Sequence, residues 1–169
     1  LANPTHPPNP AKAAWYFLGL QELLLHMHPL AAMILPGLIL SAIFLIPYWD
    51  KDETDIGHYF RSTTGKLMAL AGAILATAMV PILVLLDEYW LDLPALLPTI
   101  PTFLSNGLIP LLMTLGGLFV IYLVMRFGAR TNRSEALVGL FSFVMVSFVL
   151  LTLIGIFFRG ANMALVMPL

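Results

Sequence analysis

The sequence predicts an all-α integral membrane protein with four transmembrane helices and a short interfacial helix near its N-terminus. Of its 169 residues, 60% are hydrophobic and only 10% are charged, and the mean hydropathy is +0.93. Four apolar stretches have the length of about 20 residues that a bilayer core about 30 Å thick requires. Because lipid offers backbone amides no hydrogen-bond partners, each stretch is expected to be a helix. The predicted spans are residues 29–48, 67–86, 108–125 and 136–158.

The segments outside the spans complete one membrane domain. We predict a proline-rich extended arm over residues 1–14, an interfacial helix over 15–28 and an outer tail over 159–169. Six of the eight Lys and Arg residues lie in the two loops between spans one and two and spans three and four. By the positive-inside rule, both termini then face the periplasmic, positive side, and the expected location is the inner membrane of a bacterium. A chain that starts at Leu1 can begin inside a longer protein.

Local signals predict how the later spans begin and pack. Ser105 or Asn106 is expected to cap the third span, and Ser134 the fourth, because their side chains can accept from free backbone N–H groups. The pair Gly116-Gly117 is expected to permit close approach of a neighbouring helix.

Several function classes are excluded by composition or by missing motifs. The sequence contains no cysteine, so this chain holds no disulfide, no covalently attached c-type haem and no Cys-ligated iron–sulfur cluster. It has no phosphate-binding loop, metal-ligand spacing or nucleic-acid-binding pattern, and we predict no metal site and no nucleic-acid partner. None of the four histidines is expected to ligate haem. The last two spans carry few polar groups at membrane depth, and there is no internal repeat, which argues against a transporter.

A run of aromatic residues and the prolines that follow it carry a more specific signal. Trp15-Tyr16-Phe17 opens the short helix, Pro36 and Pro47 lie in the first span, and Arg61 lies in the loop that follows. In this order the residues resemble the C-terminal half of cytochrome b, including subunit IV of cytochrome bf complexes. In that family a Pro-Glu-Trp-Tyr motif opens a surface helix at the positive side and lines the quinol-oxidation pocket. The resemblance covers roughly residues 7–86.

The resemblance implies a subunit of a membrane quinol:cytochrome c-type oxidoreductase complex that is not catalytic alone. Its substrate would be menaquinol or ubiquinol, bound at a shared site lined by Trp15, Tyr16, Phe17 and Leu20. Its partners would be a cytochrome b subunit that holds the b-type haems, an iron–sulfur protein and c-type cytochromes. The alternative is a non-catalytic membrane scaffold or a transporter subunit.

The sequence departs from the family motif at the position of its carboxylate. Ala13-Ala14 occupies the Pro-Glu positions, yet quinol oxidation releases two protons and needs a general base. Glu22 lies about two helical turns further on, and therefore on a similar face of the helix. We predict that Glu22 is the quinol proton acceptor, the alternative being a surface carboxylate that faces water. His26 or His28 is a candidate proton relay, because the ordinary pKa of imidazole suits that role.

Charged residues at the outer ends of spans two and four are also candidates. For Asp87, Glu88 and Asp92 we favour a solvated helix end over a proton exit or a docking surface for a cytochrome. Arg159 is expected to dock a neighbouring subunit or to extend its charged end to the interface.

Overall fold

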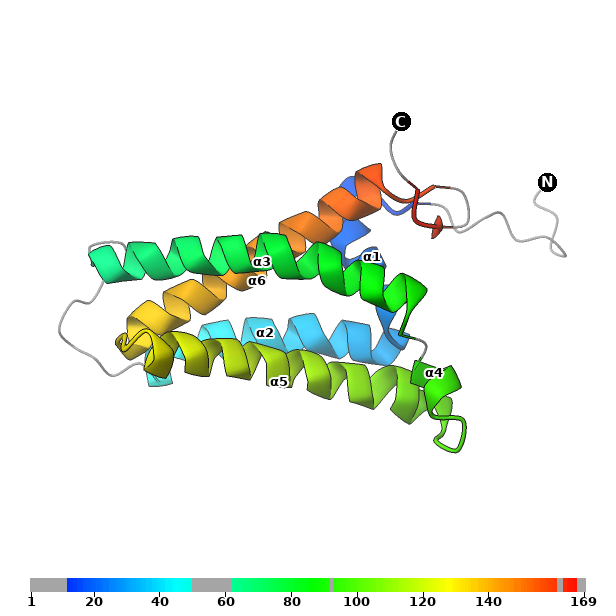
Figure 1. The fold of residues 1–169 in the computed structure, drawn as a ribbon, viewed down its shortest axis with the longest axis horizontal. Coiled ribbons are helices and arrows are strands. Elements are labelled where there is room, and N and C mark those ends of the chain that lie inside the picture. Colours follow the sequence, from blue (N-terminus) through cyan, green and yellow to red (C-terminus); the bar gives the residue numbers. More distant parts are fainter. Residues whose placement is uncertain (1–11, 50–61, 92, 161–162, 167–169) are drawn as a thin grey trace, which may run out of the picture.

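Four long apolar helices form the body of the protein (Figure 1). The computed structural model describes residues 12–49, 62–91, 93–160 and 163–166, and these are almost entirely helical. The predicted all-α fold is confirmed, with four helices long and apolar enough to span a membrane. Every predicted span lies inside an observed helix except for Phe158 at the end of the last. The four spans are α2 (Pro29–Trp49), α3 (Thr63–Tyr89), a third span over Leu104–Gly128 that contains α5 (Ile109–Leu123), and α6 (Arg133–Phe157). Their orientation in the membrane stays a prediction.

The short helix predicted before the first span is present as α1 (Leu18–His26), with a 3₁₀ turn over Trp15–Phe17 in front of it. The helix ends after His26, and two residues later the His28 N–H donates to the carbonyl oxygen of Asn106 at 2.6 Å. Pro29 then begins α2, a position where the missing proline N–H costs no intrahelical bond. The break allows α1 to run in a different direction from α2, and α1 packs on the C-terminal part of α6 (Figure 1).

The arrangement of α3 and α6 is fixed by two glycines. A Cβ atom on Gly72 would overlap the backbone carbonyl of Gly139, and one on Gly139 would lie 3.0 Å from the carbonyl oxygen of Met68. The Ser142 hydroxyl donates across the same crossing to the Ala69 carbonyl at 2.7 Å. In lipid, helices associate through close van der Waals packing and interhelical hydrogen bonds, because burying apolar surface there adds little binding free energy.

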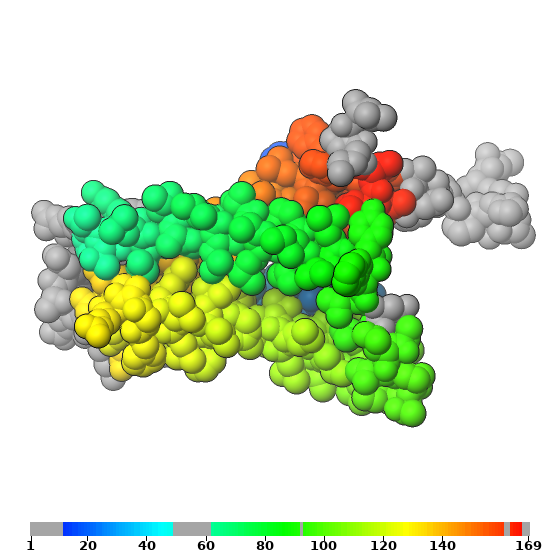
Figure 2. All heavy atoms as spheres, viewed as in Figure 1, coloured from blue at the N-terminus to red at the C-terminus, as the bar shows by residue number. Residues whose placement is uncertain are grey.

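The glycine pair of the third span does not make the contact expected of it. A Cβ on Gly116 or Gly117 would meet no atom within 4 Å in the described part of the chain, so the expected close approach of a helix is not made there by any described helix. In Figure 2, α3 and the third span form the visible face of the molecule, and the C-terminal part of the chain lies above them. Large apolar side chains cover much of the outward surface of α2 and the third span, among them Leu38, Phe44, Leu112, Phe119 and Val124. This surface suits contact with lipid or with other membrane subunits.

The helix starts also differ from prediction. Asn132 is the N-cap of α6, and its N–H donates to Glu135 at 2.9 Å, while Ser134 lies inside the helix. The third span has no cap at Ser105, because a wider π-helical turn over Leu104–Leu108 continues directly into α5. Both cap predictions were therefore wrong: a capping box of Asn132 and Glu135 begins α6, and the third span begins before Ser105.

Part of the predicted domain plan cannot be compared with the structure. Only residues 12–14 of the proline-rich arm 1–14 are among those described. The loop that contains Arg61 lies outside the described residues, as does Asp92.

At the other terminus, the Gly160 N–H donates to the Ala164 carbonyl at 2.9 Å, so the chain turns back on itself directly after α6.

Candidate functional site

Five charged or titratable side chains meet at the end of the bundle where α1, the last turns of α3 and the segment after α6 come together. We call this set the α1 ion network; its members are Glu22, His26, Asp87, Glu88 and Arg159. Two of them, Glu22 and His26, are four residues apart on α1 and therefore lie on one face of the helix. That face is turned toward α3 and the end of α6 because Gly19 lies against Phe148 and Thr152 of α6.

The centre of the α1 ion network is a buried ion pair between Glu22 and Arg159. Glu22 is fully buried and Arg159 is 3% exposed. The Arg159 guanidinium donates from Nε to both carboxylate oxygens at 3.0 Å and from Nη2 to Oε1 at 2.6 Å. Such charge-assisted contacts are stronger than neutral hydrogen bonds, and they use both oxygens of Glu22. The pair joins α1 to the far end of the chain, 137 residues away in sequence.

Two further contacts link this ion pair to α3. His26 contacts Glu22 through Nε2 at 3.3 Å and Asp87 through Nδ1 at 2.5 Å. Arg159 donates from Nη1 to Glu88 at 2.8 Å and to the Met163 carbonyl at 2.9 Å. A continuous path of hydrogen bonds therefore runs from Asp87 through α1 and Arg159 back to Glu88, the next residue of α3.

The contacts shift the protonation of both α1 groups toward their charged forms. Burial by itself disfavours the charged form of Glu22, but the hydrogen bonds and charges of His26 and Arg159 lower its pKa below the ordinary value. Burial likewise opposes the charged form of His26, yet the hydrogen bonds to Asp87 and Glu22 and their charges raise its pKa to about 9. For Arg159, burial is again outweighed by its two carboxylate partners, and its pKa is raised. At neutral pH the network thus contains the imidazolium of His26, the guanidinium of Arg159 and the carboxylate of Glu22.

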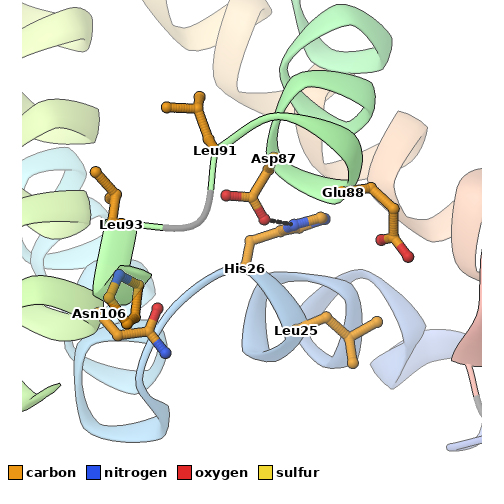
Figure 3. Close-up of a pocket in the computed structure, with 8 residues that line it drawn as sticks. Leu25, His26, Asp87, Glu88, Leu91, Leu93 and Asn106 are labelled. Atoms are coloured by element: carbon orange, nitrogen blue, oxygen red, sulfur yellow. Dashed lines mark hydrogen bonds and ion pairs between the residues drawn. The ribbon is translucent and has the colours of Figure 1, made fainter. Parts of the chain in front are cut away.

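A cavity of about 250 Å³ opens beside the network (Figure 3). His26 and Asp87 meet at its edge, and the side chain of Asn106 lies on its opposite side, beside α4 (Leu93–Leu96). The polar lining faces an open space, since the Asp87 side chain is 33% exposed and that of Glu88 30%. The other residues at the cavity are Leu25, Leu91, Leu93 and Pro94, although most of the surface exposed in it is polar.

The aromatic residues predicted to line a quinol pocket lie elsewhere on α1 and the turn before it. Trp15, Tyr16 and Phe17 are 70%, 56% and 54% exposed. They contact one another, with ring centroids 5.6 Å apart for Trp15–Tyr16 and 4.8 Å apart for Tyr16–Phe17. Leu20 is half-buried, and none of the four residues is in the lining of the cavity. Their assignment to a quinol pocket stays a prediction, and it requires a second surface that covers these rings.

The other predicted residues divide between the network and its surroundings. Glu22 is buried, so the alternative of a surface carboxylate facing water is wrong. Arg159 is buried, so the prediction that it docks a neighbouring subunit or extends to the interface is also wrong. Its guanidinium instead pairs with the buried carboxylate of Glu22. Of the two candidate relays, His26 belongs to the network, whereas His28 lies edge-to-face with Phe103 at 5.4 Å. The roles of Glu22 and His26 in proton transfer stay predictions.

The structure brings together residues that sequence reasoning treated separately. The joint position of Asp87, Glu88 and Arg159 with α1 was not predicted, although two signals pointed to it. Arg159 is a cation at the end of an apolar span on the side where cations are scarce, and Glu22 precedes His26 by one helical turn. An unpaired charge at either position would be costly in an apolar environment, so each required a partner.

No group of three or more His, Asp or Glu side chains suited to a metal ion occurs among the described residues. Comparisons with known protein families, curated proteins and solved structures find no match to this chain. The contacts within the α1 ion network and its cavity are therefore the basis for a functional proposal.

Proposed function

We propose that this chain is a membrane subunit of a quinol:cytochrome c-type oxidoreductase complex, similar to the C-terminal half of cytochrome b. It forms part of the outer-side quinol-oxidation pocket, from which electrons pass to partner redox subunits. The observation that carries the proposal is the cavity between α1 and α3, where His26 and Asp87 face an open space beside the helix that follows the Trp-Tyr pair. Titratable groups at the edge of a cavity are what a reaction that releases protons requires.

The lining of the cavity fits the head group of a quinol. A quinol ring has two hydroxyl groups, and the mainly polar lining of the cavity offers the Asp87 carboxylate and the Asn106 amide as hydrogen-bond partners. At about 250 Å³ it is slightly smaller than the roughly 300–1,000 Å³ of clefts that enclose drug-sized ligands. This size is adequate for one ring, with the apolar tail left in the surrounding lipid.

The redox centres are proposed to belong to partner subunits. The described contacts occupy both ring nitrogens of His26, so this histidine offers no lone pair to a haem iron. Oxidation of the bound quinol supplies two electrons and two protons; the proposed acceptors are a haem-bearing cytochrome b, an iron–sulfur protein and c-type cytochromes. The exposed rings of Trp15, Tyr16 and Phe17 provide a surface for the haem-bearing partner, which would complete the pocket.

The test is isolation of the native complex through an affinity tag on this chain. We expect a b-type haem in the reduced-minus-oxidised absorption spectrum and quinol-dependent reduction of a c-type cytochrome. Mass spectrometry of the same sample identifies the subunits. A preparation in which this chain has no haem-bearing neighbour and supports no quinol oxidation would contradict the proposal.

One observation favours the non-catalytic scaffold as a second candidate. Both oxygens of Glu22 are bound by Arg159, as in a purely structural ion pair. A scaffold predicts that the complex assembles with its haems and that quinol is oxidised only at sites formed by other subunits. Substitutions around the cavity would then leave the kcat of quinol oxidation unchanged.

A further inference from the structure

We infer that Asp87 is the residue of this chain that takes the proton from quinol, in the place of the carboxylate that the motif lacks. This inference rests on the proposed function and assigns the base within it. Three carboxylates belong to the α1 ion network, and they differ in their contacts and in their access to the cavity.

Glu22 is the least accessible of the three. It is fully buried, it is not part of the cavity lining, and Arg159 donates to both of its oxygens. To meet a ligand it would have to break the ion pair that holds α1 to the end of α6. Hydrogen bonds from His26 and from this guanidinium lower the pKa of Glu22.

Glu88 and Asp87 both line the cavity but are held differently. Glu88 accepts from Arg159, so it too is paired with a guanidinium. Asp87 is bound through Oδ2 by His26, and among the described residues it has no second partner. Figure 3 shows the other oxygen of Asp87 directed away from His26, toward the space between α1 and α4. Asp87 therefore combines a fixed orientation with an oxygen that a quinol hydroxyl can approach.

His26 keeps this orientation. Its imidazole lies between Asp87 and Glu22, at 2.5 Å and 3.3 Å, and is held by a carboxylate on each side. The charged groups that surround Asp87 are His26 and Glu22 of α1, Glu88 of α3, and Arg159 after α6. His26 is a positioning residue in this scheme, because it acts on quinol only through Asp87.

The proton-transfer step balances with the partners of the proposed function. As one electron leaves quinol for the iron–sulfur acceptor, a hydroxyl O–H bond breaks, the proton forms a bond to Oδ1 of Asp87, and a neutral one-electron-oxidised quinol radical is left. This radical becomes quinone when its electron passes to the haem-bearing cytochrome b and its remaining hydroxyl proton passes to water. The carboxylate becomes a neutral acid, and the acceptor gains one unit of negative charge. Because a third of the Asp87 side chain is exposed, the acid can then release its proton to water and return to the carboxylate.

The decisive experiment compares variants of the intact complex in quinol-dependent cytochrome c reduction. Asp87→Asn keeps the size of the side chain but removes the base, and we expect kcat to fall about 100-fold or more with little change in KM, within the range of general-base contributions. Asp87→Glu, which restores a carboxylate, should recover at least a tenth of the wild-type kcat. Glu135→Gln, at the opposite end of the bundle, is the matched control and should keep wild-type turnover.

A second pair of variants separates Asp87 from the other members of the network. The double variant Glu22→Gln, Arg159→Gln replaces the ion pair with two amides, and we expect more than a tenth of the wild-type kcat to remain. His26→Gln leaves Asp87 in place but removes the imidazole, and kcat should fall at least tenfold. If Asp87→Asn does not assemble, as judged by haem content, the His26→Gln result decides.

The outcomes distinguish this inference from the proposed function. A wild-type complex that oxidises quinol, with Asp87→Asn or His26→Gln within twofold of its kcat, would overturn the assignment of Asp87 alone. A loss of turnover in the Glu22 and Arg159 double variant with Asp87→Asn unaffected would return the role to Glu22. Absence of quinol oxidation in the wild-type complex would refute both.

Discussion

Replacement of Arg159 by methionine should destabilise the folded protein strongly. The guanidinium makes three hydrogen bonds to Glu22, one to Glu88 and one to the Met163 carbonyl, all at 3.0 Å or less. Methionine has a similar length but no charge and no donors. In the variant, Glu22 stays fully buried, and the only remaining partner in the α1 ion network is His26 at 3.3 Å.

The expected magnitude follows from the cost of leaving one charge of a buried pair uncompensated, about 3–5 kcal/mol. This corresponds to a decrease of roughly 10²–10⁴-fold in the equilibrium constant for folding. Replacing both partners by apolar residues removes the buried charge altogether and is often close to neutral. The double variant Glu22→Leu, Arg159→Met should therefore recover most of the loss. Glu88 loses its partner in both variants, but its side chain is 30% exposed and water can solvate it.

Equilibrium unfolding in mixed detergent micelles, followed by far-UV circular dichroism, measures the free energy of unfolding for the wild type, both single variants and the double variant. We expect a coupling energy of at least about 3 kcal/mol between the two positions, at or above the upper end for residues in contact, because each single variant leaves one buried charge unpaired and the double variant leaves none. Effects that simply add, or an Arg159→Met variant within 1 kcal/mol of the wild type, would refute a buried ion pair that holds α1 in place.

The same unfolding measurements test two further features. The pKa of His26 rises from 6.5 to about 9 in the folded state, so its stabilising contribution is complete below about pH 6.5 and is lost as the pH rises through 9. The free energy of unfolding should fall between pH 7 and pH 10, and His26→Gln should flatten this decrease; an equal slope in the variant would contradict the assignment. Gly72→Ala should cost about 1–3 kcal/mol because its Cβ would overlap the backbone of Gly139, whereas Gly116→Ala, in open space, should be neutral or slightly stabilising. Similar stabilities for the two alanine variants would show that α3 and α6 do not cross at Gly72.

The sequence was sufficient to predict the membrane spans because the signal for them is local. Twenty apolar residues in lipid have no alternative to a helix, whichever neighbours they meet. The α1 helix was also predictable, since Pro29 and the aromatic residues at its start mark its two ends. The exact helix starts were predicted less well: Asn132 begins α6 rather than Ser134, because polar residues beyond the apolar segment can continue a helix when they cap it.

The candidate site depended on contacts between parts of the chain that are distant in sequence. Glu22 could be selected as a carboxylate on the correct face of α1, but its partner Arg159 lies 137 residues further on, and Asp87 is 61 residues from His26. Which charges meet is decided by how α3 and α6 cross, and that crossing depends on Gly72 and Gly139, where two backbones come into contact. Hydropathy and helical periodicity describe one helix at a time. The pairing of buried charges, and the choice of the carboxylate that faces the cavity, is a property of the packed helices and was decided only by the tertiary structure.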